Sequence, residues 1–322
     1  MKNEYIHDAF LADVRKKIPQ NSKLVNMLVD ILFIEKEAVY RRLRREVPFT
    51  FQEIVFIAKK LGISLDNIIG IGINTDKSRP FQLKLVEYLT PSEIDYSMMD
   101  EYVNIFRQIK AEENTEAAVI SNILPQTLYS GFDYISKFYI FKWYYLYYNE
   151  KARPFHETIV PNKVMNLFTD TFIESKNIQS SYFILDYQLF ANLVTDIKYY
   201  NSIRLITKED VLKIKEDLHF FLDYIEEMTI SGCFKETGNQ VRLYISEVNI
   251  ETNYSYLLTQ KYNLSLIWTF ILTTAASLDE DVFQKMKNWF QSFIRTSTLI
   301  TITGEKQRIV FFEKQREIIN EL

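Results

Sequence analysis

The sequence predicts a mainly α-helical protein in two parts: an N-terminal bundle of five short helices, and a larger, mostly helical C-terminal domain with a small β-sheet, an α+β arrangement. Three observations lead to this fold class. Apolar residues recur at helical spacing through most of the chain. Gly and Pro number only seven each in 322 residues. Side chains typical of strands gather only around residues 240–275.

Two apolar stripes predict the first two helices. The first stripe repeats every four residues and ends at Pro19, which cannot continue a helix; its members are Ile6, Phe10, Val14 and Ile18. A second helix is expected over residues 22–32, with Ser22 at the N-cap position that its hydroxyl favours. Its inward-facing residues are Leu24, Leu28 and Leu32.

A third, short helix is predicted over residues 35–46, with Val39 and Leu43 facing inward and Pro48 closing it. This helix concentrates basic side chains, although the formal net charge of the whole chain is −4. Its arginines are Arg41, Arg42, Arg44 and Arg45. Any attraction to nucleic acid must therefore come from a local patch rather than from a global positive field.

The fourth helix has clear start and stop signals. Thr50 and Glu53 form a T-x-x-E capping box before "FQEIVFIAKKL", and Gly62 favours a stop directly after it. Its inner face consists of Ile54, Ala58 and Leu61. A fifth, short helix is expected to begin at Ser64 and to end at Gly70.

A composition change separates the two parts. Helical periodicity is lost after residue 70, and a proline follows at position 80, so we expect a domain over residues 1–72, a linker over 73–80 and a second domain over 81–322. Residues 1–75 hold 12 Lys and Arg against 9 Asp and Glu, whereas the remainder is acidic on balance. The positive charge is thus concentrated in the predicted bundle.

The second domain is expected to consist mostly of helices. Thr207 and Asp210 form an S/T-x-x-D box at the start of one of them, and the acidic residues of 277–283 suit the start of another. Strands are expected between about 240 and 275. The predicted helices cover 91–113, 126–148, 161–175, 183–199, 208–228, 279–296 and 304–321.

The stretch 129–148 contains eleven aromatic residues, which would lie on all sides of a helix. This favours a helix in the middle of the domain core; the alternative is a ligand pocket lined by tyrosines. The eleven aromatic residues are Tyr129, Phe132, Tyr134, Phe138, Tyr139, Phe141, Trp143, Tyr144, Tyr145, Tyr147 and Tyr148. The strand region could likewise present polar groups to an effector. Those groups belong to Tyr244, Asn249, Glu251 and Tyr254.

Short helices at 22–32 and 35–46, joined by a tight turn and followed by a capped helix, have the layout of a helix-turn-helix. The stretch "PFTFQEIVFIAKKLGISLDNIIG" resembles the fourth and fifth helices of the Cro/C1-type (lambda-repressor-like, XRE) DNA-binding domain. The matching positions are Ala58, Leu61, Gly62, Ile63, Ser64, Leu65 and Asp66. The resemblance covers residues 3–72, and it implies a transcriptional regulator that binds double-stranded DNA as a homodimer.

The turn before the predicted recognition helix departs from the family. Members commonly carry glycine there, where a left-handed backbone is easiest, but this chain has Phe33. Two alternatives follow. The turn is built differently, or Phe33 packs against the rest of the protein.

If the layout holds, 22–32 is the scaffold helix and 35–46 is the recognition helix, whose first turns face base edges in the major groove. Glu37, Tyr40 and Arg41 are the candidates for base contact. The expected phosphate contacts are Lys36, Arg42, Arg44 and Arg45, with Lys23 near the start of the scaffold helix. The alternatives are a merely solvated helix face, or a bundle that docks a protein partner in a scaffold protein.

No pattern in the chain indicates catalysis, so we expect no enzyme, no catalytic residue, no cofactor and no metal site. The three histidines are scattered, and the lone Cys233 excludes an internal disulfide. No apolar run is long enough for a signal peptide or a membrane span, which predicts a cytoplasmic protein without membrane association. The larger domain is expected to supply dimerisation, and a small-molecule or protein effector is its possible partner.

Overall fold

The computed structural model describes residues 2–63, 65, 68, 84–87, 96–147 and 153–322. The chain divides into two compact units, Met1–Gln82 and Leu83–Leu322, and each has a hydrophobic core of its own. The division falls beside the linker expected at 73–80. That linker and most of the expected fifth helix, 64–70, lie outside the described residues.

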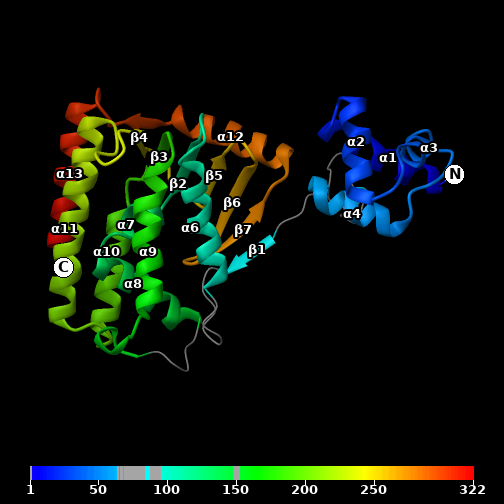
Figure 1. Cartoon of the computed structure of the whole chain (residues 1–322). Coiled ribbons are helices and arrows are strands. Elements are labelled where there is room, and N and C mark those ends of the chain that lie inside the picture. Colours follow the sequence, from blue (N-terminus) through cyan, green and yellow to red (C-terminus); the bar gives the residue numbers. More distant parts are fainter. Residues whose placement is uncertain (1, 64, 66–67, 69–83, 88–95, 148–152) are drawn as a thin grey trace. The chain divides into compact units, whose positions relative to one another are not determined.

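Four helices make up the described part of the smaller unit: α1 (Lys2–Lys17), α2 (Asn21–Leu32), α3 (Lys36–Leu43) and α4 (Phe51–Leu61) (Figure 1). α2 packs against both α3 and α4. The predicted inward-facing residues of α3, Val39 and Leu43, are buried, as expected from their spacing. The bundle core comprises Phe10, Leu11, Val14, Leu24, Val25, Leu28, Val39, Leu43, Phe49, Ile57, Ala58 and Ile63.

Both ends of α4 lie where its capping box and its glycine predict them. The Thr50 hydroxyl accepts a hydrogen bond from the Glu53 N–H, and the Glu53 carboxylate accepts one from the Thr50 N–H, which is a complete capping box. Gly62 ends the helix in the left-handed conformation, at a φ of 64°. The Ser22 cap was wrong, because α2 already begins at Asn21, with Gln20 as an N-cap whose side chain makes no capping bond.

α3 is shorter than the predicted helix 35–46. It ends at Leu43 because Arg45 takes a left-handed backbone, with a φ of 67°. The Glu46 N–H donates to the Arg41 carbonyl at 2.9 Å, and the Arg45 N–H donates to the Arg42 carbonyl at 3.0 Å. These two bonds form a Schellman motif. Such a stop is usually marked by glycine, and because this chain has arginine there, no local pattern predicts it.

The larger unit contains these described helices: α6 (Ser97–Ile109), α7 (Gln126–Tyr129), α8 (Asp133–Tyr147), α9 (Asn162–Glu174), α10 (Leu189–Ser202), α11 (Lys208–Ser231), α12 (Glu280–Ile294) and α13 (Glu305–Asn320), with short 3-10 turns η2 (Phe155–Glu157) and η3 (Ser175–Asn177). Its described strands are β1 (Lys84–Glu87), β2 (Glu116–Ser121), β3 (Ser180–Asp186), β4 (Gln240–Ser246), β5 (Asn253–Leu258), β6 (Asn263–Phe270), β7 (Thr273–Ser277) and β8 (Ser297–Leu299).

In the described part of the chain these strands form one sheet, in the order β1-β7-β6-β5-β2-β3-β4-β8. β2, β3 and β4 are parallel, and all the other pairs are antiparallel. Helices connect β2 to β3 and β3 to β4, and both steps run in the same direction across the sheet. Right-handed crossovers in one direction place all their helices on one face.

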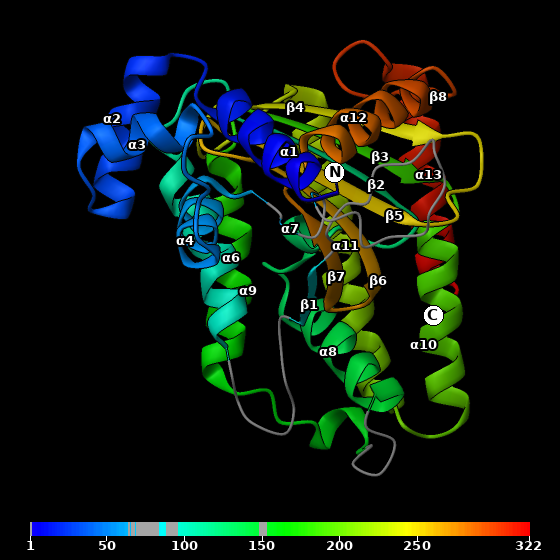
Figure 2. The same ribbon diagram turned by 90° about the vertical axis from the view of Figure 1, so that its right-hand side faces the viewer.

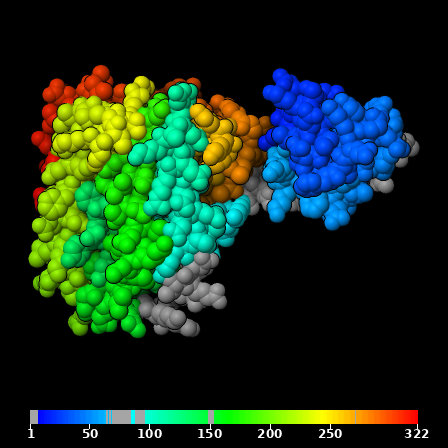
Figure 3. All heavy atoms as spheres, in the orientation of Figure 1, coloured from blue at the N-terminus to red at the C-terminus, as the bar shows by residue number. Residues whose placement is uncertain are grey.

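That face carries the main core, which unites residues of α6 to α11 and α13 (Figure 1). In the space-filling view α6, α9 and α11 cover this side of the larger unit (Figure 3). α12 lies against the opposite face, where its Phe283 and Phe290 pack on Ala118, Ile120 and Ile184 (Figure 2). Alternate residues of β2 and β3 thus point to two different cores.

The prediction of a mainly α-helical protein with a small sheet was wrong, because the larger unit is built on an eight-stranded mixed sheet. The strands expected around 240–275 are present. Four described strands were not predicted, namely β1, β2, β3 and β8, and residues 183–186 of β3 were assigned to a helix instead. β2 and β3 are covered on both faces. Such strands read as continuous apolar runs, and periodicity cannot separate them from buried helices.

The aromatic stretch belongs mainly to the core over its described residues 129–147, as favoured, but it is not one helix. α7 and α8 are separate, and Gly131 lies between them. A β-carbon on Gly131 would lie 2.6 Å from the ring of Phe172, so the close packing of α9 requires glycine there. Half of the eight α8 aromatics are buried, namely Phe138, Tyr139, Phe141 and Trp143.

The polar residues at the carboxyl ends of β2 and β3 hold the connection from β4 to β5. Residues 247–252 must pass these ends, because β5 lies beyond β2 in the strand order. The Asp186 carboxylate accepts the Ile250 N–H at 2.8 Å, and the Asn122 side chain donates to the Ile250 carbonyl at 2.8 Å. The carboxyl edge of the parallel strands, a frequent ligand site in α/β sheets, is thus occupied by the chain itself.

Candidate nucleic-acid interface

The turn between α2 and α3 consists of three residues and begins with Phe33. Phe33 has a φ of 53°, the left-handed conformation that glycine provides at this point in the Cro/C1-type pattern. Its N–H closes α2 by donating to the Val29 carbonyl at 2.9 Å. The side chain is 92% exposed. The turn therefore keeps the left-handed backbone, and Phe33 does not pack into the bundle core.

We expect Phe33→Gly to raise the free energy of unfolding of the smaller unit by about 1 kcal/mol. A left-handed backbone costs a residue with a β-carbon about 1–2 kcal/mol, and glycine avoids this cost. Part of the stabilisation is lost because glycine makes the unfolded chain more flexible. Loss of the Phe33 ring matters little, because the ring is exposed. Urea unfolding of residues 1–82 measures the change. Phe33→Ala is the control, because it removes the ring but keeps the β-carbon; equal effects of both variants would contradict the strain argument.

The exposed face of α3 carries charged side chains opposite the buried pair Val39 and Leu43. Lys36, Glu37 and Arg41 are exposed, whereas Tyr40 is partly buried and packs against the core. Arg44 and Arg45 lie in the turn beyond the helix, and both are exposed. Lys23 is exposed in the first turn of α2. Apart from Arg42 and Tyr40, the side chains of the predicted interface are thus open to solvent.

Three of the arginines make solvent-exposed ion pairs within the smaller unit. Arg41 Nε lies 3.7 Å from Glu46, Arg44 Nη2 lies 2.8 Å from Glu37, and Arg45 Nη2 lies 2.9 Å from Asp8. The three guanidinium side chains remain 55–61% exposed. Exposed pairs of this kind contribute about 0–1 kcal/mol each. Exchange of these carboxylates for phosphate would therefore cost little.

Arg42 differs from the other arginines. Its Nη2 lies 2.7 Å from Glu53, its Nε donates to the same carboxylate at 3.0 Å, and its Nη1 donates to the Ala38 carbonyl at 3.2 Å. The side chains of Arg42 and Glu53 are only 16% and 15% exposed. Because the Glu53 carboxylate also accepts the Thr50 N–H, this ion pair ties α3 to the start of α4. The guanidinium of Arg42 therefore has a structural role in joining α3 to α4.

The environment of Glu53 favours its charged form. Burial works against ionisation, but the hydrogen bonds from Arg42 and from the Thr50 N–H outweigh it, so the pKa of Glu53 lies below its ordinary value. The Glu53 carboxylate therefore stays ionised at neutral pH. Sequence reasoning placed Glu53 only in the capping box and missed its partner, because the two residues are 11 positions apart and lie on different helices.

The amino end of α2 is open to an anion. Gln20 at the N-cap makes no side-chain capping bond, and the first turn carries no acidic residue. Unpaired N–H groups and the helix dipole favour negative charge at such an end, and Lys23 adds a positive charge in the same turn.

No family model, curated protein or solved structure matches this chain. The Cro/C1-type resemblance thus stays a prediction carried by the residues quoted for it. Among the described residues no group of three or more His, Cys, Asp or Glu could hold a metal ion. No helix in the same part of the chain is both long and apolar enough to cross a membrane.

Proposed function

We propose that the chain is a sequence-specific transcriptional regulator that binds double-stranded DNA through α2 and α3. The observation that carries this proposal is the α2–α3 unit itself: a three-residue turn with a left-handed first residue, a buried stripe on α3, and an exposed basic face on its other side. This is the arrangement by which a helix-turn-helix presents its second helix to the major groove.

In this proposal Glu37, Tyr40 and Arg41 contact bases from the groove side of α3. Arginine pairs with guanine through O6 and N7, and a carboxylate accepts from the cytosine amino group. Lys36, Arg44, Arg45 and Lys23 contact phosphates around them, with the open end of α2 as an additional donor. We leave Arg42 out of the interface, because its guanidinium is held by Glu53.

We also propose that the protein binds as a homodimer whose contacts lie in the larger unit. A helix of eight residues, Lys36–Leu43, reaches too few base pairs to give useful specificity alone. The larger unit carries most of the aromatic residues, which are the side chains enriched in stable interfaces.

Arg41→Ala and Arg44→Ala should weaken DNA binding in different ways. Loss of a base contact by Arg41 should cost about 1–3 kcal/mol at the cognate site and relax the preference at one position. Loss of a phosphate contact by Arg44 should weaken all sequences alike and lower the salt slope by about one. Binding to the selected operator and to scrambled duplexes, over a salt series, measures both. Sequence-independent effects of equal size would refute these separate roles.

The same salt series tests the proposal against its alternative, a bundle that docks a protein partner. Neutralisation of several phosphates makes the logarithm of the affinity fall linearly with the logarithm of the salt concentration. Selection of duplexes from a random pool by the full-length protein supplies the operator. Failure to enrich any sequence, together with salt-insensitive capture of a protein by the bundle, would replace the DNA-binding proposal by the alternative.

A further inference from the structure

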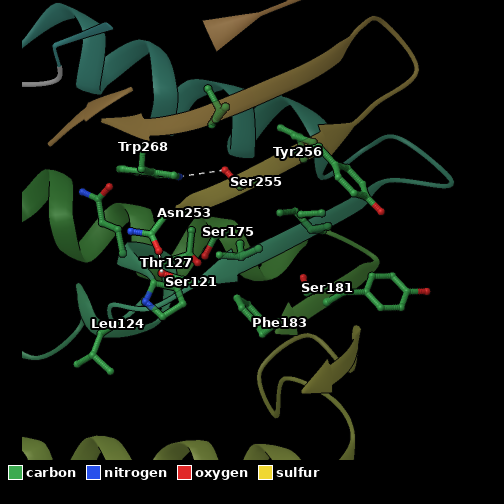
Figure 4. A pocket seen from close by; sticks show the side chains of 18 of the residues that line it. Ser121, Leu124, Thr127, Ser175, Ser181, Phe183, Asn253, Ser255, Tyr256 and Trp268 are labelled. Carbon is green, nitrogen blue, oxygen red and sulfur yellow. Dashed lines mark hydrogen bonds between the residues drawn. The ribbon is translucent and has the colours of Figure 1, made fainter. Parts of the chain in front are cut away.

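A cavity of about 70 Å³ lies inside the larger unit, on the helix-covered face of the sheet (Figure 4). Alternate residues of the strands form its floor: Ala117 and Val119 on β2, Ser255 and Leu257 on β5. Side chains of α6 and α7 form its walls. It thus lies where the parallel half of the sheet meets the antiparallel half, because β2 pairs with β3 on one side and with β5 on the other.

Most polar side chains of this cavity have partners within the protein. The Trp268 indole N–H donates to the Ser255 hydroxyl at 3.1 Å, and the Ser121 hydroxyl lies 3.1 Å from the Asn253 amide oxygen (Figure 4). Gln126 differs from these residues. Its side chain lines the cavity, the residue is 6% exposed, and neither its Nε2 nor its Oε1 has a hydrogen-bond partner in the described part of the chain.

An unpaired amide of this kind opposes folding. A buried donor or acceptor without a partner loses its hydrogen bonds to water and gains nothing in return, and Gln126 buries one of each. A leucine or methionine at this position would pack in the same space without that cost. The glutamine is therefore better explained by a group that enters the cavity than by a contribution of its own to the stability of the fold.

The lining also defines the charge of that group. None of the described residues that line the cavity is Asp, Glu, Lys, Arg or His. A charged ligand would lose its hydration without a compensating partner, so only a neutral one fits. Tyr129 does not change this, because burial raises its pKa well above its ordinary value and keeps its hydroxyl neutral. The other walls are mainly aromatic and aliphatic, among them Phe106 and Leu264.

We infer that this cavity is a binding site for a small, neutral, mainly apolar molecule that carries an amide-type edge, with a donor and an acceptor side by side. A lactam meets this description. Its N–H would donate to the Gln126 Oε1 while its carbonyl accepts from the Gln126 Nε2, and its ring would lie against the apolar walls. Both orphaned atoms of Gln126 are then satisfied by one ligand. The site belongs to the larger unit and does not depend on the proposed DNA binding.

The test uses full-length protein and three small probes of similar shape: 2-pyrrolidinone, N-methyl-2-pyrrolidinone, which has no donor, and cyclopentanone, which has only the acceptor. The chain has three tryptophans, so three indole N–H signals are expected in an ¹⁵N spectrum, and Trp268→Phe assigns the one at the cavity. The Trp268 signal should shift in a saturable way with 2-pyrrolidinone, whereas that of Trp289, which is half-exposed on α12, should not move.

Gln126→Met separates a ligand-binding role from a structural one. It should weaken 2-pyrrolidinone binding about tenfold or more, which corresponds to the loss of one or two buried hydrogen bonds. It should also raise the melting temperature of the ligand-free protein. Gln291→Met, the same change at an exposed position of α12, should alter neither quantity. A filled cavity, made by Ala117→Leu, should abolish the binding of all three probes.

Several results would overturn the inference. One is the absence of a saturable shift of the Trp268 signal with 2-pyrrolidinone. Another is equal affinity for the three probes, or unchanged affinity in Gln126→Met. Either result would mean that Gln126 makes no hydrogen bonds to the amide edge of the ligand. A lower melting temperature in Gln126→Met would show that the amide is satisfied within the free protein by ordered water, for which a cavity of this volume has room for about five molecules.

Discussion

Glu53→Ala is expected to lower the free energy of unfolding of the smaller unit by about 3 kcal/mol, the low end of the range for breaking a buried ion pair. The substitution removes the acceptor of two bonds from Arg42 and one from the Thr50 N–H. The Arg42 guanidinium, mostly buried, would then lack a counter-charge, and half of the capping box would be lost. For a domain of this size that is a large part of its total stability.

Chemical unfolding of residues 1–82, followed by circular dichroism, measures this effect. Glu37→Ala is the matched control, because it also removes an arginine partner but breaks only the exposed pair with Arg44, and it should change stability by less than about 1 kcal/mol. Equal losses in the two variants would contradict the structural role of the Arg42–Glu53 pair.

The same pair predicts the acid sensitivity of the smaller unit. The pKa of Glu53 is lowered in the folded state, so its contribution to stability is complete above the pKa of the unfolded chain. It is lost as the pH falls through the lowered pKa of the folded state. In Glu53→Gln this contribution is absent at every pH, and stability should therefore fall less steeply on acidification than in the unchanged protein.

Removal of the larger unit is expected to weaken operator binding by a factor of about 10² to 10⁴. This is the factor by which joining two binding modules typically raises the overall affinity. In the proposed dimer, contacts of the larger unit join two bundles, so that binding of the second half-site becomes an intramolecular step. The fragment Met1–Gln82 retains its core and its α2–α3 unit but not these contacts. It should bind one half-site as well as the full-length protein does.

Sedimentation and footprinting on a palindromic operator test this division of labour. The full-length protein should be a dimer and should protect two half-sites whose centres are about 34 Å apart, or a multiple of that distance. A duplex with a single half-site is the control, on which the fragment and the whole chain should bind alike. A fragment that dimerises as well as the whole chain, or a full-length protein that stays monomeric on DNA, would contradict the proposal.

The exposure of most side chains in the candidate interface was predictable from the sequence. Burial of Val39 and Leu43 follows from helical spacing, and it places Glu37, Arg41 and Arg44 on the other side, where the structure has them. The pairing of Arg42 with Glu53 was not predictable. On a helical wheel it lies at the flank of the basic face, and only the approach of α4 decides that it pairs with Glu53.

The cavity of the larger unit was likewise not predictable from the sequence. The aromatic stretch around Tyr129 indicated a core helix, with a tyrosine-lined pocket as the alternative, but nothing in it singled out Gln126. A glutamine at the start of a short helix is unremarkable in sequence. It becomes informative only when β2, β5 and α7 come together around it and its amide finds no partner in the part of the chain that the structure describes.

The sequence by itself determined those local features for which it carries a clear signal, the two capping boxes and the glycine stop of α4, but not the start of α2 or the stop of α3. Both predicted capping boxes, Thr50–Glu53 and Thr207–Asp210, are formed, and Gly62 ends its helix in the left-handed conformation. Tertiary structure alone decided which strands pair and that Glu53 is the counter-charge of Arg42. It also decided that the amide of Gln126 has no hydrogen-bond partner among the described residues. Capping bonds close within one helical turn, so a short pattern encodes them. Strand pairing, the Arg42–Glu53 pair and the cavity require contacts between segments distant in sequence, which no local pattern specifies.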